Sequence, residues 1–291
     1  MRKVWIVAGP TASGKTKYAI EKAKEIGGEI INCDSLQIYD ELKTLTAYPT
    51  KEEMDGVPHK LFGYLKYNQK STVADWATLA AKEVEKTFQN GKIPIIAGGS
   101  GLYINILTNG ISPLPEVSSK NRKLAEESAK NDYNALCDEL YKFDPELRNF
   151  ITNDKRRQTI RAYEIFLETG KSILRYFKDY PKLKFLENVE YEYKIMEYER
   201  AALYEKINER LEYMLQAGAI EEVKQLLSKI GCDDRTALFN DYPIFKAIGA
   251  KEITLYLDGI YSFEKMKEMI KTNTRHYAKR QITWFKYRMP N

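Results

Sequence analysis

The glycine-rich segment of residues 9–16 constrains the fold of this chain more than any other part of its sequence. It runs Gly-Pro-Thr-Ala-Ser-Gly-Lys-Thr and fits the pattern G-x-x-x-x-G-K-[ST] at every position. An apolar run at residues 4–8 precedes it, and a helical pattern at residues 15–26 follows it. Strand, glycine-rich loop and helix in this order predict a phosphate-binding loop, in which backbone N–H groups and the helix N-terminus surround one anion. The alternative, an ordinary turn with a coincidental glycine pair, is disfavoured because both pattern and context match.

Short apolar runs alternate with helical patterns over the first 110 residues. The apolar runs predict strands at residues 4–8, 29–33 and 93–97. The helical patterns lie at residues 15–26 and 71–89. This alternation is typical of a parallel sheet with crossover helices.

Two prolines, Pro113 and Pro115, mark a change in the character of the chain. Residues 118 to about 180 are helical, charged and poor in strand signals. After them we expect a strand at 190–196 and helices at 200–216, 220–229, 244–257 and 262–286, with a loop at 231–243. The sequence therefore predicts an α/β protein in which residues 1–112 and 186–291 form a P-loop catalytic core with a parallel sheet and crossover helices. Residues 113–185 are expected to form a helical insertion domain.

Composition excludes several classes of protein. Hydrophobic residues make up 43% of the chain and charged residues 30%, which permits a sizeable core and excludes a disordered chain. Cys33, Cys137 and Cys232 form no C-x-x-C pair, so a zinc site or a disulfide framework is disfavoured and a reducing compartment is favoured. The sequence has neither a signal-peptide pattern nor a run of 18 apolar residues. We therefore expect a cytoplasmic protein without a membrane-spanning segment.

Asp34 is the one acidic residue at a predicted strand end in the first half of the chain. The strand at 93–97 ends instead in Gly-Gly-Ser, although ATP-using enzymes with such a loop usually hold Mg²⁺ with an acid at a second strand end. The carboxyl ends of the strands line the ligand crevice of an open parallel sheet, so we expect Asp34 beside the loop. From the residues alone, three roles stay open for Asp34: metal ligand, general base, or turn cap.

A series of motifs runs in order along nearly the whole chain. They include Gly9-Pro-Thr-Ala-Ser-Gly-Lys-Thr16, Asp34-Ser-Leu-Gln-Ile-Tyr39, Thr46-Ala-Tyr-Pro49, Gly98-Gly-Ser-Gly-Leu-Tyr103, Arg161-Ala-Tyr-Glu164, Arg210-x-x-x-Met214 and Tyr277-Ala-Lys-Arg-Gln281. Together they resemble the tRNA dimethylallyltransferases, the bacterial tRNA isopentenyltransferase family. The glycine-rich segment alone is shared with many proteins, but its combination with the Asp34 motif and the basic C-terminal motif is specific.

The resemblance implies transfer of a dimethylallyl group from dimethylallyl diphosphate to N6 of the adenosine at position 37 of tRNAs that read U-initial codons. The product would be N6-isopentenyladenosine. The loop would bind an allylic diphosphate instead of a nucleotide, which explains the missing second acid. A monomer is implied, with catalytic roles for Asp34 as base, Lys15, Thr16 as the Mg²⁺ ligand, and Arg210. The diphosphate-binding residues would be Gly9, Pro10, Thr11, Ala12, Ser13, Gly14, Lys15 and Thr16.

The same resemblance implies contacts with the anticodon stem-loop of tRNA. The residues it indicates are Asp34, Ser35, Leu36, Gln37, Ser100, Arg157, Gln158, Arg161, Arg275, Lys279 and Arg280. The last three belong to residues 271–291, which hold six basic residues and no acid, whereas the whole chain has a net charge of only +5. Aromatic side chains between these basic residues suit an RNA partner, and an ordinary C-terminal helix with solvated basic residues is the alternative.

Several positions depart from the family pattern, three of them at expected binding contacts. Tyr48 replaces a basic residue, Gln158 replaces an Arg, and Ala250 replaces a Tyr, so binding contacts are affected more than Asp34, Lys15 or Thr16. The alternatives are a P-loop small-molecule kinase, an adenylate isopentenyltransferase that modifies a free nucleotide, and a non-catalytic RNA-binding protein. The long helical insertion and the basic C-terminal segment favour a tRNA substrate.

Overall fold

The computed structural model describes residues 2–152 and 154–289 and divides the chain into two compact units. The core unit comprises Met1–Thr108 and Phe185–Asn291, and the inserted unit comprises Asn109–Lys184. The sequence analysis placed the inserted segment at residues 113–185. Each unit has its own hydrophobic core, and each is described below by itself.

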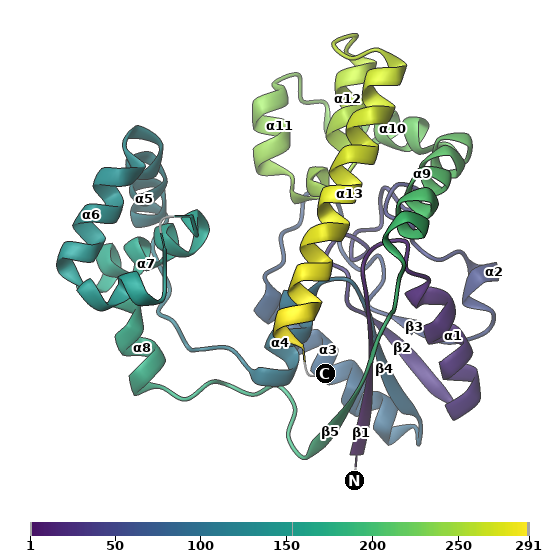
Figure 1. The fold of residues 1–291 in the computed structure, drawn as a ribbon, viewed down its shortest axis with the longest axis horizontal. Coiled ribbons are helices and arrows are strands. Elements are labelled where there is room, and N and C mark those ends of the chain that lie inside the picture. Colours follow the sequence, from purple (N-terminus) through teal and green to yellow (C-terminus); the bar gives the residue numbers. More distant parts are fainter. Residues whose placement is uncertain (1, 153, 290–291) are drawn as a thin grey trace. The chain divides into compact units, whose positions relative to one another are not determined.

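A five-stranded parallel sheet forms the centre of the core unit (Figure 1). The strands lie in the order β3 (His59–Lys60), β2 (Gly28–Asn32), β4 (Ile93–Gly98), β1 (Arg2–Ala8) and β5 (Val189–Ile195). All four pairings are parallel, with Ile6 opposite Ile96 on one side and Tyr193 on the other. The predicted α/β class is therefore confirmed, as are the four strands expected from the sequence. The short strand β3 was not predicted.

Helices cover both faces of this sheet because successive strand residues point to opposite sides. Val7, Ile30 and Ile95 pack against α1 (Lys15–Ile26) on one face. On the other face, Ile6, Ile31 and Ile96 share a core with α3 (Val73–Gln89). The fully buried Trp76 of α3 donates its indole N–H to the carbonyl of Asn32 at 3.0 Å, which anchors this helix to the end of β2.

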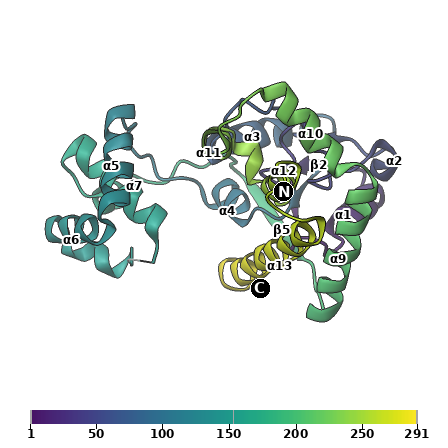
Figure 2. The ribbon, with the colours of Figure 1, turned by 90° about the horizontal axis from the view of Figure 1, so that it is seen from above.

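Most helices that follow β5 lie beyond the carboxyl ends of the strands, and α13 runs back from there to end beside α4 (Figure 1). They are α9 (Arg200–Gln216), α10 (Ala219–Ile230), α11 (Arg235–Asp241), α12 (Ala250–Leu257) and α13 (Phe263–Arg288). Viewed from above, α9 and α13 are close to one another (Figure 2), and Arg275 of α13 donates to Asn208 of α9 at 2.9 Å. Two short helices, α2 (Lys51–Met54) and α4 (Gly101–Asn109), lie earlier in the chain and were not predicted.

Two predictions for this region are wrong. The loop expected at 231–243 contains helix α11, which begins after Asp234, whose side chain accepts hydrogen bonds from the N–H groups of Thr236 and Ala237. The continuous helix expected at 244–257 is instead a 3-10 turn, Pro243–Lys246, followed by α12. Gly249 separates the two at φ +103°, a conformation that favours glycine and ends the helical pattern.

The inserted unit is helical, as its sequence predicted. It contains α5 (Ser119–Asn131), α6 (Tyr133–Phe143), the 3-10 helix Pro145–Asn149, α7 (Arg156–Thr169) and α8 (Ile173–Asp179). Its core includes Cys137, Leu140, Leu147 and Ile165. Its two chain ends pair with each other through Ile111 and Leu183, which exchange backbone hydrogen bonds of 3.0 and 2.9 Å. Two ends held together allow the unit to be an insertion between strands of the core.

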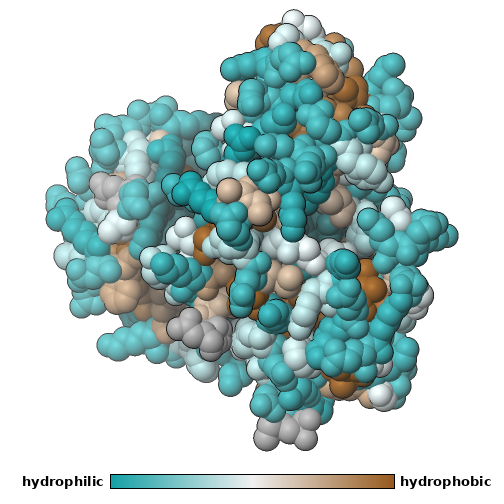
Figure 3. All heavy atoms as spheres, turned by 45° about the vertical axis from the view of Figure 1, so that its right-hand side comes forward, coloured by the Kyte–Doolittle hydropathy of each residue, from teal (hydrophilic) through white to brown (hydrophobic). Residues whose placement is uncertain are grey.

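The surface drawn in Figure 3 is mostly hydrophilic, with hydrophobic groups in small separate patches. Over the described residues, no helix is both long and apolar enough to cross a membrane.

Candidate active site

The glycine-rich loop (residues 9–16) lies between β1 and α1, as predicted. Gly9 has no room for a side chain, because a Cβ there would come within 2.8 Å of both Met196 and Ser13. Ala12 and Gly14 have φ of +64° and +82°, so the backbone reverses sharply before α1 begins. Among the described residues, no side chain caps α1 at Gly14. The first N–H groups of α1 are thus free of side-chain partners, as an anion site at a helix N-terminus requires.

Two half-buried cations, Lys15 and Arg210, stand beside this loop. Burial lowers the pKa of Lys15 to about 8, with the Asp34 carboxylate opposing the shift and the nearby Arg210 adding to it. Burial also lowers the pKa of Arg210, again opposed by Asp34. The guanidinium of Arg210 donates to Thr11 Oγ1 at 2.6 Å, although these residues are far apart in the sequence. A dianion bound here would restore the charge balance that one carboxylate leaves incomplete.

Asp34 lies two residues after the end of β2 and is held in a tight polar turn. Its backbone N–H donates to Asn32 Oδ1 at 2.9 Å, and its own Oδ1 accepts from the N–H of Leu36 at 2.9 Å. Within residues 2–152 and 154–289, Oδ2 has no hydrogen-bond donor, so one carboxylate oxygen stays available for a proton. Asp34 therefore forms the turn through one carboxylate oxygen and leaves the other without a donor, so the roles of turn cap and general base are compatible with one geometry.

The ends of β2 and β4 meet at a closely packed junction. Gly98 faces the backbone of Cys33, and a Cβ on Gly98 would lie 2.0 Å from the carbonyl oxygen of Cys33. Ser100 follows, and its Oγ accepts a hydrogen bond from Ser35 N–H at 3.1 Å. The glycines after β4 thus bring the Ser100 hydroxyl beside the Asp34 turn.

Gln281 of α13 connects three segments of the site. This buried side chain accepts from the N–H of Thr11 at 2.8 Å and donates to the carbonyl of Gly99 at 2.9 Å. Tyr277, one turn earlier on α13, lies near Asp34, and burial together with that carboxylate raises the pKa of its hydroxyl well above the usual range. The C-terminal helix therefore contributes buried polar groups to the site as well as surface charge.

Two of the cavities that adjoin the loop have one lining residue in common, Arg210. The smaller cavity, of about 80 Å³, has both polar and aliphatic side chains in its lining, and we call it the apolar cavity after its wall of Ile207, Leu211 and Met214. Its full lining is Thr11, Asp34, Leu36, Leu45, Thr46, Ile207, Arg210, Leu211, Met214, Ala247, Ile248, Ile270, Thr274 and Tyr277. The basic cavity, of about 580 Å³, is lined by Ala12, Gly14, Lys15, Thr16, Lys17, Ile20, Glu21, Lys24, Glu53, Asp55, Lys206 and Arg210. A ligand with an anionic end and a short hydrocarbon end matches this pair of cavities.

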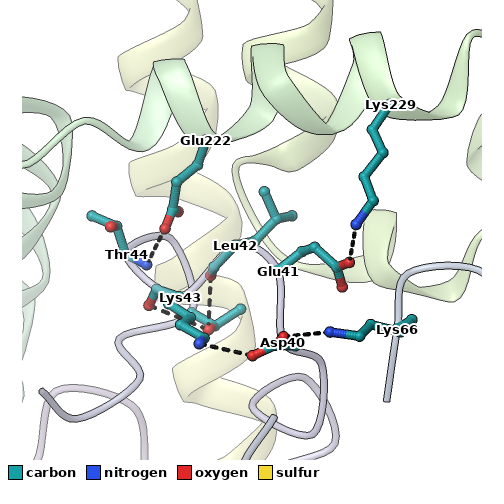
Figure 4. A network of polar contacts seen from close by, with 9 residues as sticks. Asp40, Glu41, Leu42, Lys43, Thr44, Lys66, Glu222 and Lys229 are labelled. Atoms are coloured by element: carbon teal, nitrogen blue, oxygen red, sulfur yellow. Dashed lines mark hydrogen bonds and ion pairs between the residues drawn. The ribbon is translucent and has the colours of Figure 1, made fainter. Parts of the chain in front are cut away.

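A polar network holds the segment that carries Leu45 into the apolar cavity (Figure 4). Glu222 of α10 accepts hydrogen bonds from the N–H groups of Thr44 and Leu45 at 2.8 and 3.1 Å. The nearby Glu41 pairs with Lys229 of α10 at 2.8 Å. The wall of the cavity therefore depends on charged side chains of a distant helix.

The structure distributes the predicted tRNA-contacting residues over both units. In the core unit, Asp34, Ser35, Leu36 and Ser100 lie together at the ends of β2 and β4. The side-chain amide of Gln37 points inward and donates to the carbonyls of Thr46 and Ala47 at 2.9 and 2.8 Å. That amide is therefore already occupied by the protein.

The other predicted tRNA contacts also divide into exposed side chains and side chains that already have a partner within the protein. On α13, Lys279 and Arg280 are exposed, whereas Arg275 donates to Asn208 and lies 5.7 Å from the Tyr204 ring centroid. In the inserted unit, Arg157 and Gln158 are exposed on α7. Arg161 pairs with Glu164 at 2.7 Å. The exposed members are free to meet a partner, and the paired ones also have a structural role.

Sequence reasoning missed three residues of the site. Lys206 lines the basic cavity one helical turn before Arg210, and this i, i+4 spacing was a signal that it could have used. Tyr277 and Gln281 lie in a recognised motif, but the motif does not tell which of its residues turn inward. Lys206 is exposed and, within the described residues, forms no ion pair.

The site suits a magnesium ion that arrives with a phosphorylated substrate. No group of three or more His, Cys, Asp and Glu side chains capable of holding a metal occurs in the described part of the chain. Thr16 offers a hydroxyl oxygen at the basic cavity. Mg²⁺ prefers oxygen ligands and commonly keeps water and substrate phosphate in its coordination shell. The Thr16 hydroxyl is therefore compatible with one ligand position of such an ion.

These features are typical of an enzyme that acts on a phosphorylated substrate. A family model described as IPP transferase matches residues 37–288. The tRNA dimethylallyltransferase of Ehrlichia ruminantium is 38% identical over 100% of this chain and 94% of its own length. That of Pelagibacter ubique is 39% identical over 99% of this chain and 89% of its own. The chain belongs to the IPP transferase family and is a transferase.

Solved structures agree with this assignment. A eukaryotic dimethylallyltransferase acting on tRNA superposes with a TM-score of 0.84 at 27% identity, covering 98% of this chain and 70% of that one. The tRNA isopentenylpyrophosphate transferase of Staphylococcus epidermidis gives a TM-score of 0.67 at 34% identity, covering 100% and 92%. The family named by the sequence motifs is thereby confirmed.

Proposed function

We propose that this enzyme transfers a dimethylallyl group from dimethylallyl diphosphate to N6 of the adenosine at position 37 of tRNAs that read U-initial codons. The observation that carries the proposal is the meeting of the two cavities at Arg210. Its guanidinium lies between a basic cavity suited to a diphosphate and an apolar cavity suited to a short prenyl group. Asp34 lines the apolar cavity, where the carbon under attack would lie.

The glycine-rich loop would stabilise the departing diphosphate. As the C1–O bond breaks, its electron pair stays on the diphosphate, and negative charge grows on the oxygens there. Lys15, Arg210 and the N–H groups at the start of α1 would surround that position. Because these groups are desolvated and fixed, they need little rearrangement to stabilise the charge. Mg²⁺ held by Thr16 would neutralise further charge on the same oxygens.

Asp34 would accept the proton from N6. The exocyclic nitrogen is a poor nucleophile because its lone pair is delocalised into the adenine ring. When the N6–C1 bond forms, N6 must lose one proton, and the free Oδ2 of Asp34 is the nearby base that can take it. The hydrogen bond from Leu36 N–H to Oδ1 fixes the orientation of the carboxylate.

The tRNA would reach Asp34 with its adenine turned out of the anticodon-loop stack. Single-stranded loops are recognised by splayed bases and by contacts to the backbone. Lys279, Arg280, Lys286 and Arg288 supply exposed positive charge along α13, and Arg157 is an exposed cation of the inserted unit. We propose these residues as phosphate contacts, and Ser35 and Ser100 as contacts near the adenine.

We further propose that the enzyme acts as a cytoplasmic monomer. Its free cysteines Cys33, Cys137 and Cys232 are compatible with a reducing compartment. The kinase alternative is not favoured, because β4 ends in Gly98 followed by Gly99 and Ser100 and offers no second acid for magnesium. The relatives named above also disfavour it.

The proposal is tested by incubating the protein with Mg²⁺, labelled dimethylallyl diphosphate and an unmodified tRNA that reads a U-initial codon, with AMP and ATP as rival acceptors. We expect label in tRNA, and a loss of roughly 10²–10⁴-fold in kcat/KM for Asp34→Asn, because a neutral amide cannot take the proton. Label in AMP would identify an adenylate isopentenyltransferase instead. ATP hydrolysis without any transfer would refute the transferase proposal, and full activity in Asp34→Asn would remove Asp34 as the base.

A further inference from the structure

A third cavity lies next to the apolar cavity. This outer cavity, of about 690 Å³, is lined by Lys43, Thr44, Ala47, Tyr48, Pro49, Thr50, Lys51, Glu53, Met54, His59, Arg210, Tyr213, Met214 and Ala217. It shares two residues with the apolar cavity, Arg210 and Met214. Arg210 is held by its hydrogen bond to Thr11. The side chain of Met214 is therefore the apolar part of the wall between the two cavities.

The apolar cavity is too small for a long hydrocarbon chain. An apolar protein cavity of about 150 Å³ accepts benzene, a ring of six carbons, and the apolar cavity here measures about 80 Å³. A branched five-carbon group is about the size of benzene, so it already takes up the whole of the apolar cavity, and a ten-carbon chain would have to continue elsewhere. The outer cavity offers that space, with Ala47, Tyr48, Tyr213 and Ala217 as partners for further carbons.

The side chain of Met214 lies between the apolar cavity and the outer cavity. It lies one helical turn after Arg210 on α9, so it faces the same side of the helix. It is 8% exposed and packs in the main core cluster. Leu211 offers a useful contrast, since it lines the apolar cavity from the same helix but does not border the outer cavity.

We propose that Met214 limits the donor to a five-carbon prenyl group by closing the apolar cavity toward the outer cavity. The inference rests on the proposed function, since it assumes that the apolar cavity holds the prenyl group. The chemistry does not change with chain length: the C1–O bond breaks with its electron pair leaving on diphosphate, the N6–C1 bond forms, and Asp34 takes the N6 proton. Shortening Met214 joins the cavities and admits geranyl diphosphate, the ten-carbon homologue.

The experiment offers dimethylallyl and geranyl diphosphates in competition to the unaltered enzyme and to Met214→Ala, with tRNA as acceptor. The mass of the modified nucleoside identifies which group was transferred. We expect the unaltered enzyme to transfer the five-carbon group only. In Met214→Ala, the ratio of kcat/KM for the geranyl donor to that for the dimethylallyl donor should rise by roughly 10–100-fold, the range of discrimination that a few carbon atoms supply.

Leu211→Ala is the matched control, because it removes the same number of non-hydrogen atoms from the same cavity without opening the partition. Its ratio should stay within about twofold of the unaltered enzyme, as should that of Met214→Leu, which keeps the side-chain volume. Met214→Val, with thermal unfolding followed by circular dichroism, replaces Met214→Ala if that variant does not fold. Geranyl transfer by Leu211→Ala that equals transfer by Met214→Ala would overturn the inference. So would the absence of geranyl transfer by a folded Met214→Ala or Met214→Val variant. Failure of the unaltered enzyme to use dimethylallyl diphosphate would instead refute the proposed function.

Discussion

The basic residues of this enzyme fall into two groups that differ in their contact with water. Lys15 and Arg210 stand beside the glycine-rich loop, and burial lowers the pKa of each. Lys279 and Arg280 lie on α13 and are exposed. A desolvated cation binds an anion strongly but lowers the stability of the fold. A solvated cation binds an anion weakly, costs the fold little stability, and loses its attraction as the salt concentration rises. The first group therefore suits chemistry on a diphosphate, and the second suits reversible contact with a long polyanion.

The largest effect should come from replacing the desolvated lysine. Lys15→Met should lower kcat/KM for dimethylallyl diphosphate by about 10³-fold, because it removes a fixed charge from the leaving group. The same change should raise the free energy of unfolding at pH 7 by about 1–3 kcal/mol, since the pKa of Lys15 is depressed to about 8 by burial of its charge. Steady-state kinetics and urea unfolding measure the two effects. Lys86→Met, an exposed lysine of α3 that lines none of the named cavities, is the control, and a loss of stability in Lys15→Met would contradict the contrast.

The contrast should extend to acidic residues on α10. Glu222 accepts two backbone hydrogen bonds from the segment of Leu45 (Figure 4), whereas its neighbour Glu221 is exposed, with Lys224 at 3.9 Å. Glu222→Ala should lower the free energy of unfolding by about 2 kcal/mol, because it leaves two N–H groups without their charged acceptor. Glu221→Ala should change it by less than about 0.5 kcal/mol. Urea denaturation measures both, and equal effects would show that burial does not distinguish them.

A smaller effect is expected for the basic cavity, where three exposed lysines can be compared. Lys24 pairs with Asp55 and Lys17 lies 4.0 Å from Glu21, whereas Lys206 forms no ion pair within the described residues. Lys206→Ala should weaken the binding of inorganic pyrophosphate by about fivefold, which is the contribution of an exposed charge pair. Lys24→Ala should leave the affinity within about twofold. Calorimetric titration measures both, and the opposite order would place the diphosphate at the other end of the cavity.

The smallest effect should come from a single exposed cation of α13. Arg280→Ala should weaken tRNA binding by about threefold and reduce the slope of log affinity against log salt by about 0.7, as loss of one contact to a single-stranded backbone predicts. Affinity for pyrophosphate should not change. Filter binding at several salt concentrations gives the slope. An unchanged slope would remove Arg280 from the tRNA interface.

Much of the fold was predictable because strong local patterns agree with the tertiary structure. The four longer strands, α1, α3 and α9 follow from hydrophobic periodicity, and the loop follows from its glycines. The short elements β3, α2 and α4 were missed because so few residues carry no distinct period. The predicted helix at 244–257 is interrupted at Gly249. A Cβ at this position would lie 2.7 Å from Leu45 of a distant segment, a contact that the local sequence pattern does not show.

The sequence by itself determined the glycine-rich loop, the parallel sheet and the position of Asp34 at a strand end, because each depends on residues that are close together in the chain. It could not decide which side chains of a motif turn inward, since that depends on segments far apart in sequence. Only the tertiary structure brought Arg210 to Thr11 and Gln281 to the loop. Only it placed Met214 between two cavities. The burial of the site residues and the charges that surround them follow from these long-range contacts, which is why they could not be predicted from the sequence alone.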